Sequence, residues 1–267
     1  MIRVNSDIIE QNHFPDGTLN IKLPTIVKST VDIIWDYEND AELFTLICIR
    51  KHYAKKNVIL YMDYIPHARM DRVKKSDDVF TLKYFCEVIN SLDFSAVIVL
   101  DPHSNVAPAL IENVVVLNPD SQIDQVIGDI HWDIGGDADL VAFYPDEGAM
   151  KRYSDYATLP YAFGVKKRDW ATGKIEGLTL MNKEVLEDKP VLIIDDICSR
   201  GGTFYHSALE ISKYTGEPIY LYITHCEKQF LREICLILVL LREFTQRMHY
   251  LTSPRNIKIL LSKYKEK

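Results

Sequence analysis

The sequence lacks the features that mark membrane, secreted or nucleic-acid-binding proteins. Its longest apolar run, within "EICLILVLLREF", has about eight uninterrupted apolar residues, too few to cross a bilayer. The first residues, "MIRVNSDIIE", contain no apolar stretch typical of a signal peptide. A formal net charge of -7 argues against general affinity for nucleic acid or anionic membrane, so phosphate binding would require local basic clusters.

Cysteine is scarce and irregularly placed. None of the five cysteines forms a CxxC pair, and they lie far apart in the chain, at Cys48, Cys86, Cys198, Cys226 and Cys235. Neither a disulfide framework nor a zinc site is indicated, so we expect reduced thiols in a cytoplasmic protein.

Short apolar runs alternate with amphipathic segments of helical length along the whole chain. The length of 267 residues and the 47% hydrophobic content are sufficient for two domains with their own cores. The expected strands are 31–35, 57–64, 96–101, 114–117, 139–146, 161–167, 176–180, 190–196 and 218–225. The expected helices are 41–56, 80–92, 148–159 and 203–216. This alternation predicts two α/β domains, 1–134 and 135–267, each with a mainly parallel sheet flanked by helices.

In such sheets ligands bind beyond the carboxyl ends of the strands, and the stretch "VLIIDDICSRGGTF" is unusual there. Its apolar strand ends on Asp195 and Asp196, and Gly201 and Gly202 follow in a turn. We expect Thr203 to cap a helix beginning near Phe204. The alternative is an ordinary glycine turn after a strand that happens to end in acids.

This turn combines two kinds of binding group. Backbone N–H groups and the N-terminus of a helix favour a phosphate, whereas two carboxylates suit neighbouring hydroxyls or a magnesium shell. A site with both is expected to bind a sugar phosphate.

The stretch resembles the ribose-phosphate-binding motif of phosphoribosyltransferases and of phosphoribosyl pyrophosphate synthetases (ribose-phosphate pyrophosphokinases). Further segments resemble only the synthetases, and they occur in the same order from about Phe14 to Glu227. These segments are "HFPDGTLNIKL", "YIPHARMDRV", "VIVLDPHSN", "YPDEGAMKR", "GVKKRDW" and "IYLYITHCE". The resemblance implies two phosphoribosyltransferase-like domains and transfer of the β,γ-diphosphate of ATP to a sugar hydroxyl, with AMP leaving.

The resemblance also implies roles for individual residues. His103 and Asp146 would help to hold Mg²⁺-ATP, and Arg69 would contact the triphosphate, with Asp71 and Arg72 bracing it as a charge-assisted pair. The "FPDG" turn, with Phe14 and Asp16, would help to hold ATP. Phe14 would either stack on adenine or anchor its turn in the core, and His103 alone would be an ordinary histidine. His67 and His225 are interpreted as structural.

The segment "KKRDWATGKIEG" is expected to form a mobile hairpin. In the family it resembles, the lysine and arginine of this loop close over the transferring group, which here implies Lys166 and Arg168 as catalytic residues. Such a lid excludes water when hydrolysis of ATP is the competing reaction. Without the other motifs, three adjacent cations would indicate a solvated turn.

The sequence departs from the family pattern at several points. Thr18 stands where a glutamate is usual near the adenine, and "NVAPALIEN" replaces a stretch that shapes a subunit contact. Only 13 residues precede Phe14, from which we expect the family's first strand and helix to be largely absent. The resemblance implies a homodimer or larger homo-oligomer, with no nucleic-acid or membrane partner.

The departure with the clearest chemical consequence lies in the sugar-phosphate turn. Ser199 and Arg200 replace the usual aspartate-threonine pair before the glycines. An arginine binds phosphate oxygens bidentately, so the turn is expected to be more cationic and to accommodate more anionic oxygen than one phosphate presents. Two acceptors therefore remain open, ribose 5-phosphate and ADP-ribose, the second as a step in NAD salvage.

The resemblance ends abruptly after "THCEK". Residues 229–254 lose the family pattern. With freely chosen synonymous codons, a reading one base out of phase can restore that pattern. We hypothesise two compensating single-base changes, near Lys228 and Pro254, either as sequencing errors or as real changes; ordinary divergence is the alternative.

Two other functions compete with the diphosphotransferase interpretation. A phosphoribosyltransferase would use the same turn, but it would lack the N-terminal "FPDG", "ARMDR" and "DPH" elements. A catalytically silent regulatory relative is opposed by the presence of Lys166, Arg168, His103 and Asp146, although Thr18 and the altered turn keep it open.

Overall fold

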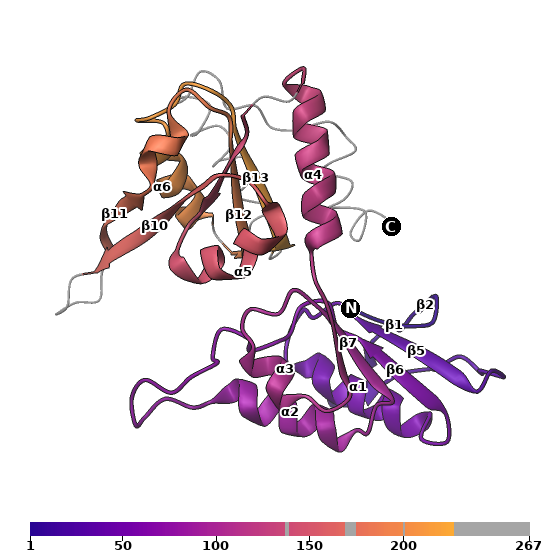
Figure 1. Cartoon of the computed structure of the whole chain (residues 1–267). Coiled ribbons are helices and arrows are strands. Elements are labelled where there is room, and N and C mark those ends of the chain that lie inside the picture. The colour runs from indigo at the N-terminus through magenta and orange to yellow at the C-terminus, as the bar shows by residue number, and fades with distance from the viewer. Residues whose placement is uncertain (137–138, 169–174, 200, 227–267) are drawn as a thin grey trace. The chain divides into compact units, whose positions relative to one another are not determined.

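The chain forms two compact units, Met1–Asn118 (unit 1) and Pro119–Lys267 (unit 2), in a computed structural model (Figure 1). The structure describes residues 1–136, 139–168, 175–199 and 201–226. Each unit contains a mainly parallel sheet with helices, which confirms the predicted fold class. The hypothesis about residues 229–254 lies outside the described residues.

Unit 1 contains a six-stranded sheet in the order β2-β1-β5-β6-β7-β8, in which β5 to β8 are parallel. Strand β1 lies before Phe14 and pairs antiparallel with β5, so a strand is present in a segment where little of the family pattern was expected. The elements are β1 (Ile2–Val4), β2 (Asp7–Ile8), β3 (Asn12–His13), β4 (Leu19–Asn20), β5 (Thr30–Trp35), α1 (Ala41–His52), β6 (Asn57–Tyr61), α2 (Thr81–Ser91), β7 (Ala96–Leu100), α3 (Val106–Leu110) and β8 (Val114–Leu117).

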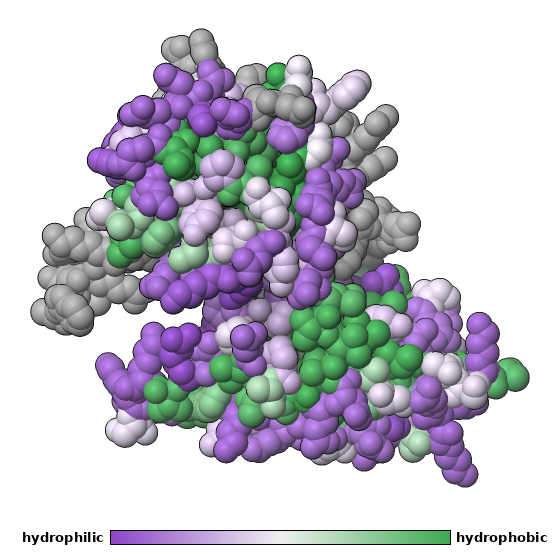
Figure 2. Space-filling view, in the orientation of Figure 1, coloured by the Kyte–Doolittle hydropathy of each residue, from purple (hydrophilic) through white to green (hydrophobic). Residues whose placement is uncertain are grey.

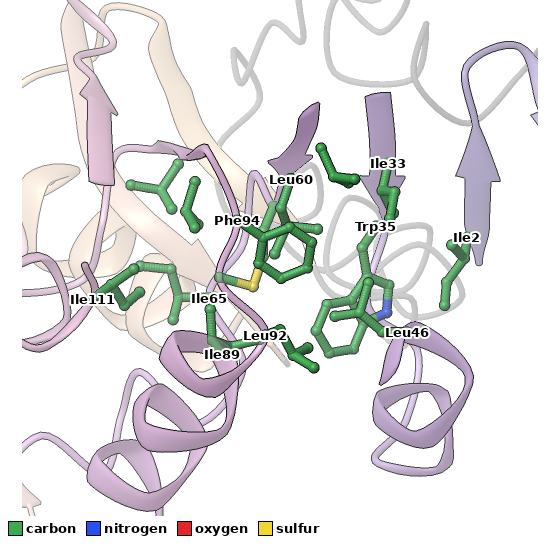
Figure 3. Close-up of a cluster of buried hydrophobic side chains, with 14 of the residues drawn as sticks. Ile2, Ile33, Trp35, Leu46, Leu60, Ile65, Ile89, Leu92, Phe94 and Ile111 are labelled. Carbon is green, nitrogen blue, oxygen red and sulfur yellow. The ribbon is translucent and has the colours of Figure 1, made fainter. Parts of the chain in front are cut away.

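The core of unit 1 follows from the two-residue period of its strands. Alternate residues of β5 are buried, because successive side chains point to opposite faces of the sheet. Figure 3 shows Ile33 and Trp35 from this strand packing toward Leu46 of α1, with Ile89 of α2 nearby. The indole Nε1 of Trp35 donates a hydrogen bond to buried Glu42 at 3.0 Å, which satisfies the polar atom of the largest core side chain.

Unit 2 contains a five-stranded sheet in the order β11-β10-β9-β12-β13. All its pairings are parallel except that between β10 and β11, which form the hairpin expected around the three adjacent cations. The elements are α4 (Asp120–Asp133), β9 (Val141–Tyr144), α5 (Glu147–Ala157), β10 (Tyr161–Arg168), β11 (Ile175–Met181), the short 3₁₀ helix Lys183–Leu186, β12 (Val191–Cys198), α6 (Gly202–Ile211) and β13 (Ile219–Cys226).

Both faces of the unit 2 sheet are buried, as expected for parallel strands covered on two sides. Ile193 of β12 belongs to one hydrophobic cluster, together with Phe204 of α6. The next residue, Ile194, belongs to the cluster on the other side, with Tyr153 of α5 and Ile130 of α4. Helix α6 therefore covers one face, and α4 and α5 cover the other.

The boundary between the units lies earlier than the predicted division after residue 134. Helix α4 was not among the predicted elements, and it belongs to unit 2 because its apolar side packs against that sheet. Two tyrosines of β13 also hold it: Tyr220 donates to Asp133 and Tyr222 donates to Gln122, both at 3.0 Å. These contacts join residues about a hundred positions apart, which local sequence patterns do not reveal.

Hydrophilic residues cover much of the visible surface of both units, interrupted by hydrophobic ones (Figure 2). Within the described ranges, no helix combines the length and apolar character that crossing a membrane would require.

Candidate functional site

The paired carboxylates of unit 2 lie where β12 extends beyond its neighbour. Strand β12 pairs with β9 only from Val191 to Ile193, whereas its pairing with β13 continues to Cys198. Asp195 and Asp196 therefore lie past the end of β9, at the carboxyl edge of the sheet. This placement agrees with the expectation that the strand delivers both acids to that edge.

Helix α5 begins next to these acids and contributes two charged groups. Asp146 is its N-cap, and the Oδ1 atom of Asp146 accepts a hydrogen bond from the backbone N–H of Ala149 at 3.1 Å. Further along the helix, Arg152 forms an ion pair with Asp196, with 3.0 Å between Nη1 and Oδ2. The sequence analysis identified Asp146 and missed Arg152.

Two glycines allow the chain to pack closely around Asp146. A Cβ atom on Gly164 of β10 would lie 2.7 Å from the carbonyl oxygen of Pro145, and one on Gly148 would lie 3.2 Å from Oδ1 of Asp146. A side chain at position 164 would therefore displace the segment that carries Asp146. Gly164 was also missed, because its role depends on a contact between neighbouring strands.

Asp195 and Asp196 lie in different electrostatic environments. Burial raises the pKa of Asp195 to about 8, and the nearby carboxylates of Asp196 and Asp146 contribute to the rise. Burial alone would lower the pKa of Arg152, but its attraction to Asp196 outweighs this and raises it. In the free protein, Asp195 is therefore the acid that retains a proton, while Asp196 is paired with a cation.

This arrangement predicts a pH-dependent stability that Asp195→Asn removes. The unfolded chain releases the Asp195 proton near pH 4 and the folded chain near pH 8. The stabilising contribution is therefore fully present below about pH 4 and is lost as the pH rises through 8. In the wild type the free energy of unfolding falls between pH 5 and pH 8. We expect this decrease to be smaller by ~1–2 kcal/mol in Asp195→Asn, measured by urea unfolding.

The control for this experiment is Asp124→Asn, which removes an exposed acid of the same unit. It is expected to leave the pH dependence as in the wild type. An unchanged pH dependence in Asp195→Asn would contradict the assigned proton position.

The glycine turn after β12 differs in one respect from the prediction. Helix α6 begins at Gly202, and its N-cap is Gly201, whose φ of 73° lies in the left-handed region. Thr203 lies inside the helix, so the prediction that it caps the helix was wrong. The left-handed conformation, which glycine adopts without strain, lets the helix begin two residues earlier. Ser199 lies in the bend before this turn, and Arg200 lies outside the described residues.

The start of α6 presents backbone donors to the loop. The first bond of the helical ladder runs from the N–H of Tyr205 to the carbonyl oxygen of Gly201, at 3.0 Å. The N–H groups of Gly202, Thr203 and Phe204 precede this bond and have no acceptor within the helix. With the helix dipole, they form the kind of end that binds an anion.

The expected catalytic cations lie at the hairpin end of β10. Lys166 and Arg168 belong to this strand, which pairs antiparallel with β11 and has an irregularity between Lys167 and Arg168. Residues 169–174, at the hairpin tip, lie outside the described residues. In unit 2 the backbone thus brings together the β10–β11 hairpin, Asp146, the two acids and the glycine turn at one edge of the sheet.

In unit 1, Asp71 and Arg72 form the expected charge-assisted pair. Arg72 donates through Nε and Nη2 to the two oxygens of Asp71, at 2.7 and 3.1 Å. Arg72 and a hydrogen bond from Ser104 lower the pKa of Asp71, and His103 adds a smaller electrostatic contribution. His103 and Ser104 thus both interact with Asp71 of this pair. Arg69, which precedes the pair in the sequence, is exposed.

The "FPDG" turn is held by its own hydrogen bonds. Asp16 accepts bonds from the backbone N–H and the hydroxyl of Thr18, at 3.0 and 2.7 Å, and these bonds lower the pKa of Asp16. Phe14 is 52% exposed, which agrees with a stacking surface better than with a core anchor. Thr18, the unusual residue of this turn, therefore serves to fix Asp16.

A metal site is not assembled by the described residues alone, because they contain no group of three or more His, Cys, Asp or Glu side chains suited to one. The two predicted metal ligands lie in different units, His103 in unit 1 and Asp146 in unit 2.

Comparison with known proteins identifies relatives that cover most of the chain. A ribose-phosphate pyrophosphokinase of Saccharolobus solfataricus is 26% identical to the chain over 241 residues, covering 85% of this chain and 80% of that protein. The chain is thus similar in sequence to ribose-phosphate pyrophosphokinases over most of its length. Another member, from Mycoplasma pneumoniae, is 25% identical and covers 84% of this chain and 69% of its own length. No protein-family model matches the chain.

A solved structure also shares the fold. The phosphoribosylpyrophosphate synthetase from Mycobacterium smegmatis superimposes with a TM-score of 0.68 and 16% sequence identity, covering 84% of this chain and 76% of that one. The chain therefore shares its fold with that synthetase.

Proposed function

We propose that the protein transfers the β,γ-diphosphate of ATP to the anomeric hydroxyl of ribose 5-phosphate, giving phosphoribosyl pyrophosphate and AMP. The observation that carries this proposal is the meeting of Asp195 and Asp196 with the helix end at Gly201–Phe204. Homology to ribose-phosphate pyrophosphokinases supports it. The reaction places the protein in nucleotide biosynthesis, and the four free cysteines among the described residues fit a cytoplasmic location.

In this proposal the sugar phosphate is bound by unit 2. The N–H groups at the start of α6 and the side chains of Ser199, Arg200 and Thr203 bind the 5′-phosphate. Asp195 and Asp196 accept hydrogen bonds from the ring hydroxyls. The proton that Asp195 retains in the free protein is then released, because hydrogen bonds to the ionised form of a carboxylate favour it.

ATP is assigned to the groups gathered in unit 1. Phe14 stacks on the adenine from the turn that Asp16 and Thr18 hold, and Arg69 contacts the triphosphate. Asp71 keeps Arg72 in one orientation, so the guanidinium is pre-organised for phosphate oxygens. Lys166 and Arg168 close over the transferring diphosphate from the β10–β11 hairpin and exclude water.

We propose Mg²⁺ as the cofactor, because it prefers oxygen ligands and retains several waters. In unit 2, Asp146 would supply a carboxylate beside two further acids. In unit 1, His103 would supply an imidazole next to Asp71. When bound, Mg²⁺ would neutralise charge on the phosphate oxygens. We also propose a homodimer or larger homo-oligomer, as implied by the family, with no nucleic-acid or membrane partner.

ADP-ribose is the second candidate acceptor, favoured by one residue. Arg200 adds a guanidinium to a turn that otherwise binds a single phosphate, and ADP-ribose presents a diphosphate there. Its product would be ADP-ribose pyrophosphate, a step toward rebuilding NAD.

The test offers ribose 5-phosphate and ADP-ribose in parallel with Mg²⁺-ATP and follows AMP by chromatography. We expect AMP to form with one acceptor at least ~10-fold faster than with the other, since the turn cannot suit both equally. AMP formation without any acceptor is the control for simple hydrolysis.

Inertness toward both acceptors would exclude the diphosphotransferase. Transfer of the phosphoribosyl group of phosphoribosyl pyrophosphate to a base, with release of pyrophosphate, would then indicate a phosphoribosyltransferase. ATP binding without any transfer would indicate a silent regulatory relative.

A further inference from the structure

Arg152 is a half-buried cation that the reaction scheme above does not use. Its guanidinium lies 3.0 Å from Asp196, and the two side chains are 23% and 7% exposed. It also lies over the ring of Tyr153, 5.6 Å from the ring centroid. An ion pair this deep in the protein is costly to desolvate, and retaining it requires a compensating use or very good geometry.

The ion pair gives Asp196 a different electrostatic environment from that of Asp195. Asp196 is held by Arg152, whereas the charges acting on Asp195 are those of Asp196 and Asp146, both acidic. The backbone N–H of Asp196 also donates to Oδ1 of Asp195 at 3.0 Å, so the two side chains are oriented relative to each other. Asp196 is thus fixed from α5, and Asp195 is fixed from the backbone of its neighbour.

We propose that Arg152 is a positioning residue for the sugar: it holds the Asp196 carboxylate in the orientation in which a ring hydroxyl donates to it. This inference rests on the proposed function, because it assigns a task within the same sugar-phosphate site. Arg152 contacts Asp196 and acts through it, so it is not itself a catalytic residue.

The expected effect follows from the cost of ordering a side chain. A carboxylate that is already fixed loses no rotational freedom when the sugar binds, whereas a loosened one does. Loss of the guanidinium is expected to weaken sugar-phosphate binding by about 10-fold. ATP binding, assigned to unit 1, is expected to remain unchanged.

A purely structural role for Arg152 makes a different prediction. The contact with Tyr153 and the burial of the pair would then stabilise unit 2 without affecting ligand selectivity. Variants would unfold more easily, but the folded fraction would bind sugar phosphate with the affinity of the wild type.

The experiment compares Arg152→Met with Arg152→Lys and with Lys151→Met in the full chain. Lys151 is the adjacent residue on α5, and its pair with Glu147 is exposed, so Lys151→Met removes the same charge outside the site. Calorimetry with ribose 5-phosphate and with ADP-ribose gives Kd, and AMP formation gives separate KM values for sugar and ATP. We expect Arg152→Met to raise Kd and KM for the sugar about 10-fold, Arg152→Lys to restore part of the affinity, and Lys151→Met to match the wild type.

A double variant keeps the test decisive if Arg152→Met does not fold. Removing both partners, in Arg152→Met with Asp196→Asn, leaves no unpaired buried charge and is expected to be tolerated better. If Arg152 acts through Asp196, adding Arg152→Met to Asp196→Asn produces no further loss of sugar binding.

The outcomes separate this inference from the proposed function. Two outcomes overturn the positioning role alone, provided that the wild type binds the sugar. The first is an equal sugar affinity in Arg152→Met, and the second is a fully additive loss of affinity in the double variant. Failure of the wild type to bind either sugar phosphate overturns the proposed function and the positioning role together.

Discussion

Replacing Lys166 by alanine is expected to reduce AMP formation by ~100- to 1,000-fold while leaving ATP binding within about twofold of the wild type. Stabilisation of charge that develops during transfer is worth this much when one donor is removed. ATP affinity is expected to persist because the groups assigned to the adenine and the triphosphate, among them Phe14 and Arg69, lie in unit 1. The measurement combines a single-turnover assay for AMP with calorimetric titration of ATP.

Lys167→Ala is the matched control for this variant, because it removes an equal charge from the adjacent position of β10. We expect it to retain most of the activity. Equal losses in the two variants would mean that the hairpin contributes only its net charge. Full activity in Lys166→Ala would remove the catalytic assignment of this residue.

Gly201→Val is expected to weaken sugar-phosphate binding by about 30-fold or more and to lower the free energy of unfolding by ~2 kcal/mol. The φ of 73° at this position is strained for any residue with a Cβ, and most of all for a β-branched one. Relief of the strain moves the N–H groups that begin α6 away from the phosphate. Titration with ribose 5-phosphate and urea unfolding measure the two effects.

Gly202→Ala provides the contrast. It is the first residue of α6, has an ordinary helical φ, and has nothing within 4 Å of the position that a Cβ would occupy. Alanine favours helix over glycine by up to ~1 kcal/mol, so stability is expected to be maintained or raised. If Gly201→Val and Gly202→Ala behave alike, the left-handed turn is not what positions the helix end.

Much of the fold could be predicted from local patterns. The apolar run 31–35 was predicted as a strand, and the structure has β5 there. Helix α4 was missed because Asp, Gln and Gly dilute its apolar positions, and its identity as part of unit 2 depends on contacts with Tyr220 and Tyr222. Patterns within a short window carry no information on such distant partners.

The candidate site was predictable to the extent that its residues belong to contiguous motifs. The pairing of Asp71 with Arg72 joins neighbours in sequence and was expected, although its role with ATP stays a prediction. Thr203 was assigned as a cap because threonine commonly takes that position, whereas the backbone at Gly201 decided where the helix begins. Arg152 and Ser104 act across elements, so only the structure could reveal them.

Helix α5 has an acid, Asp146, at its N-cap and a cation, Arg152, more than one turn later. The first acts electrostatically on Asp195, and the second forms an ion pair with Asp196. Because a helix is stiff along its axis, the two groups cannot move independently, and their spacing is set by backbone hydrogen bonds rather than by loop conformation. If helix α5 frays, both charged groups therefore lose their positions together. The charge distribution of the site thus depends on one helix, and a small local loss of helical order there is expected to lower activity before it lowers global stability.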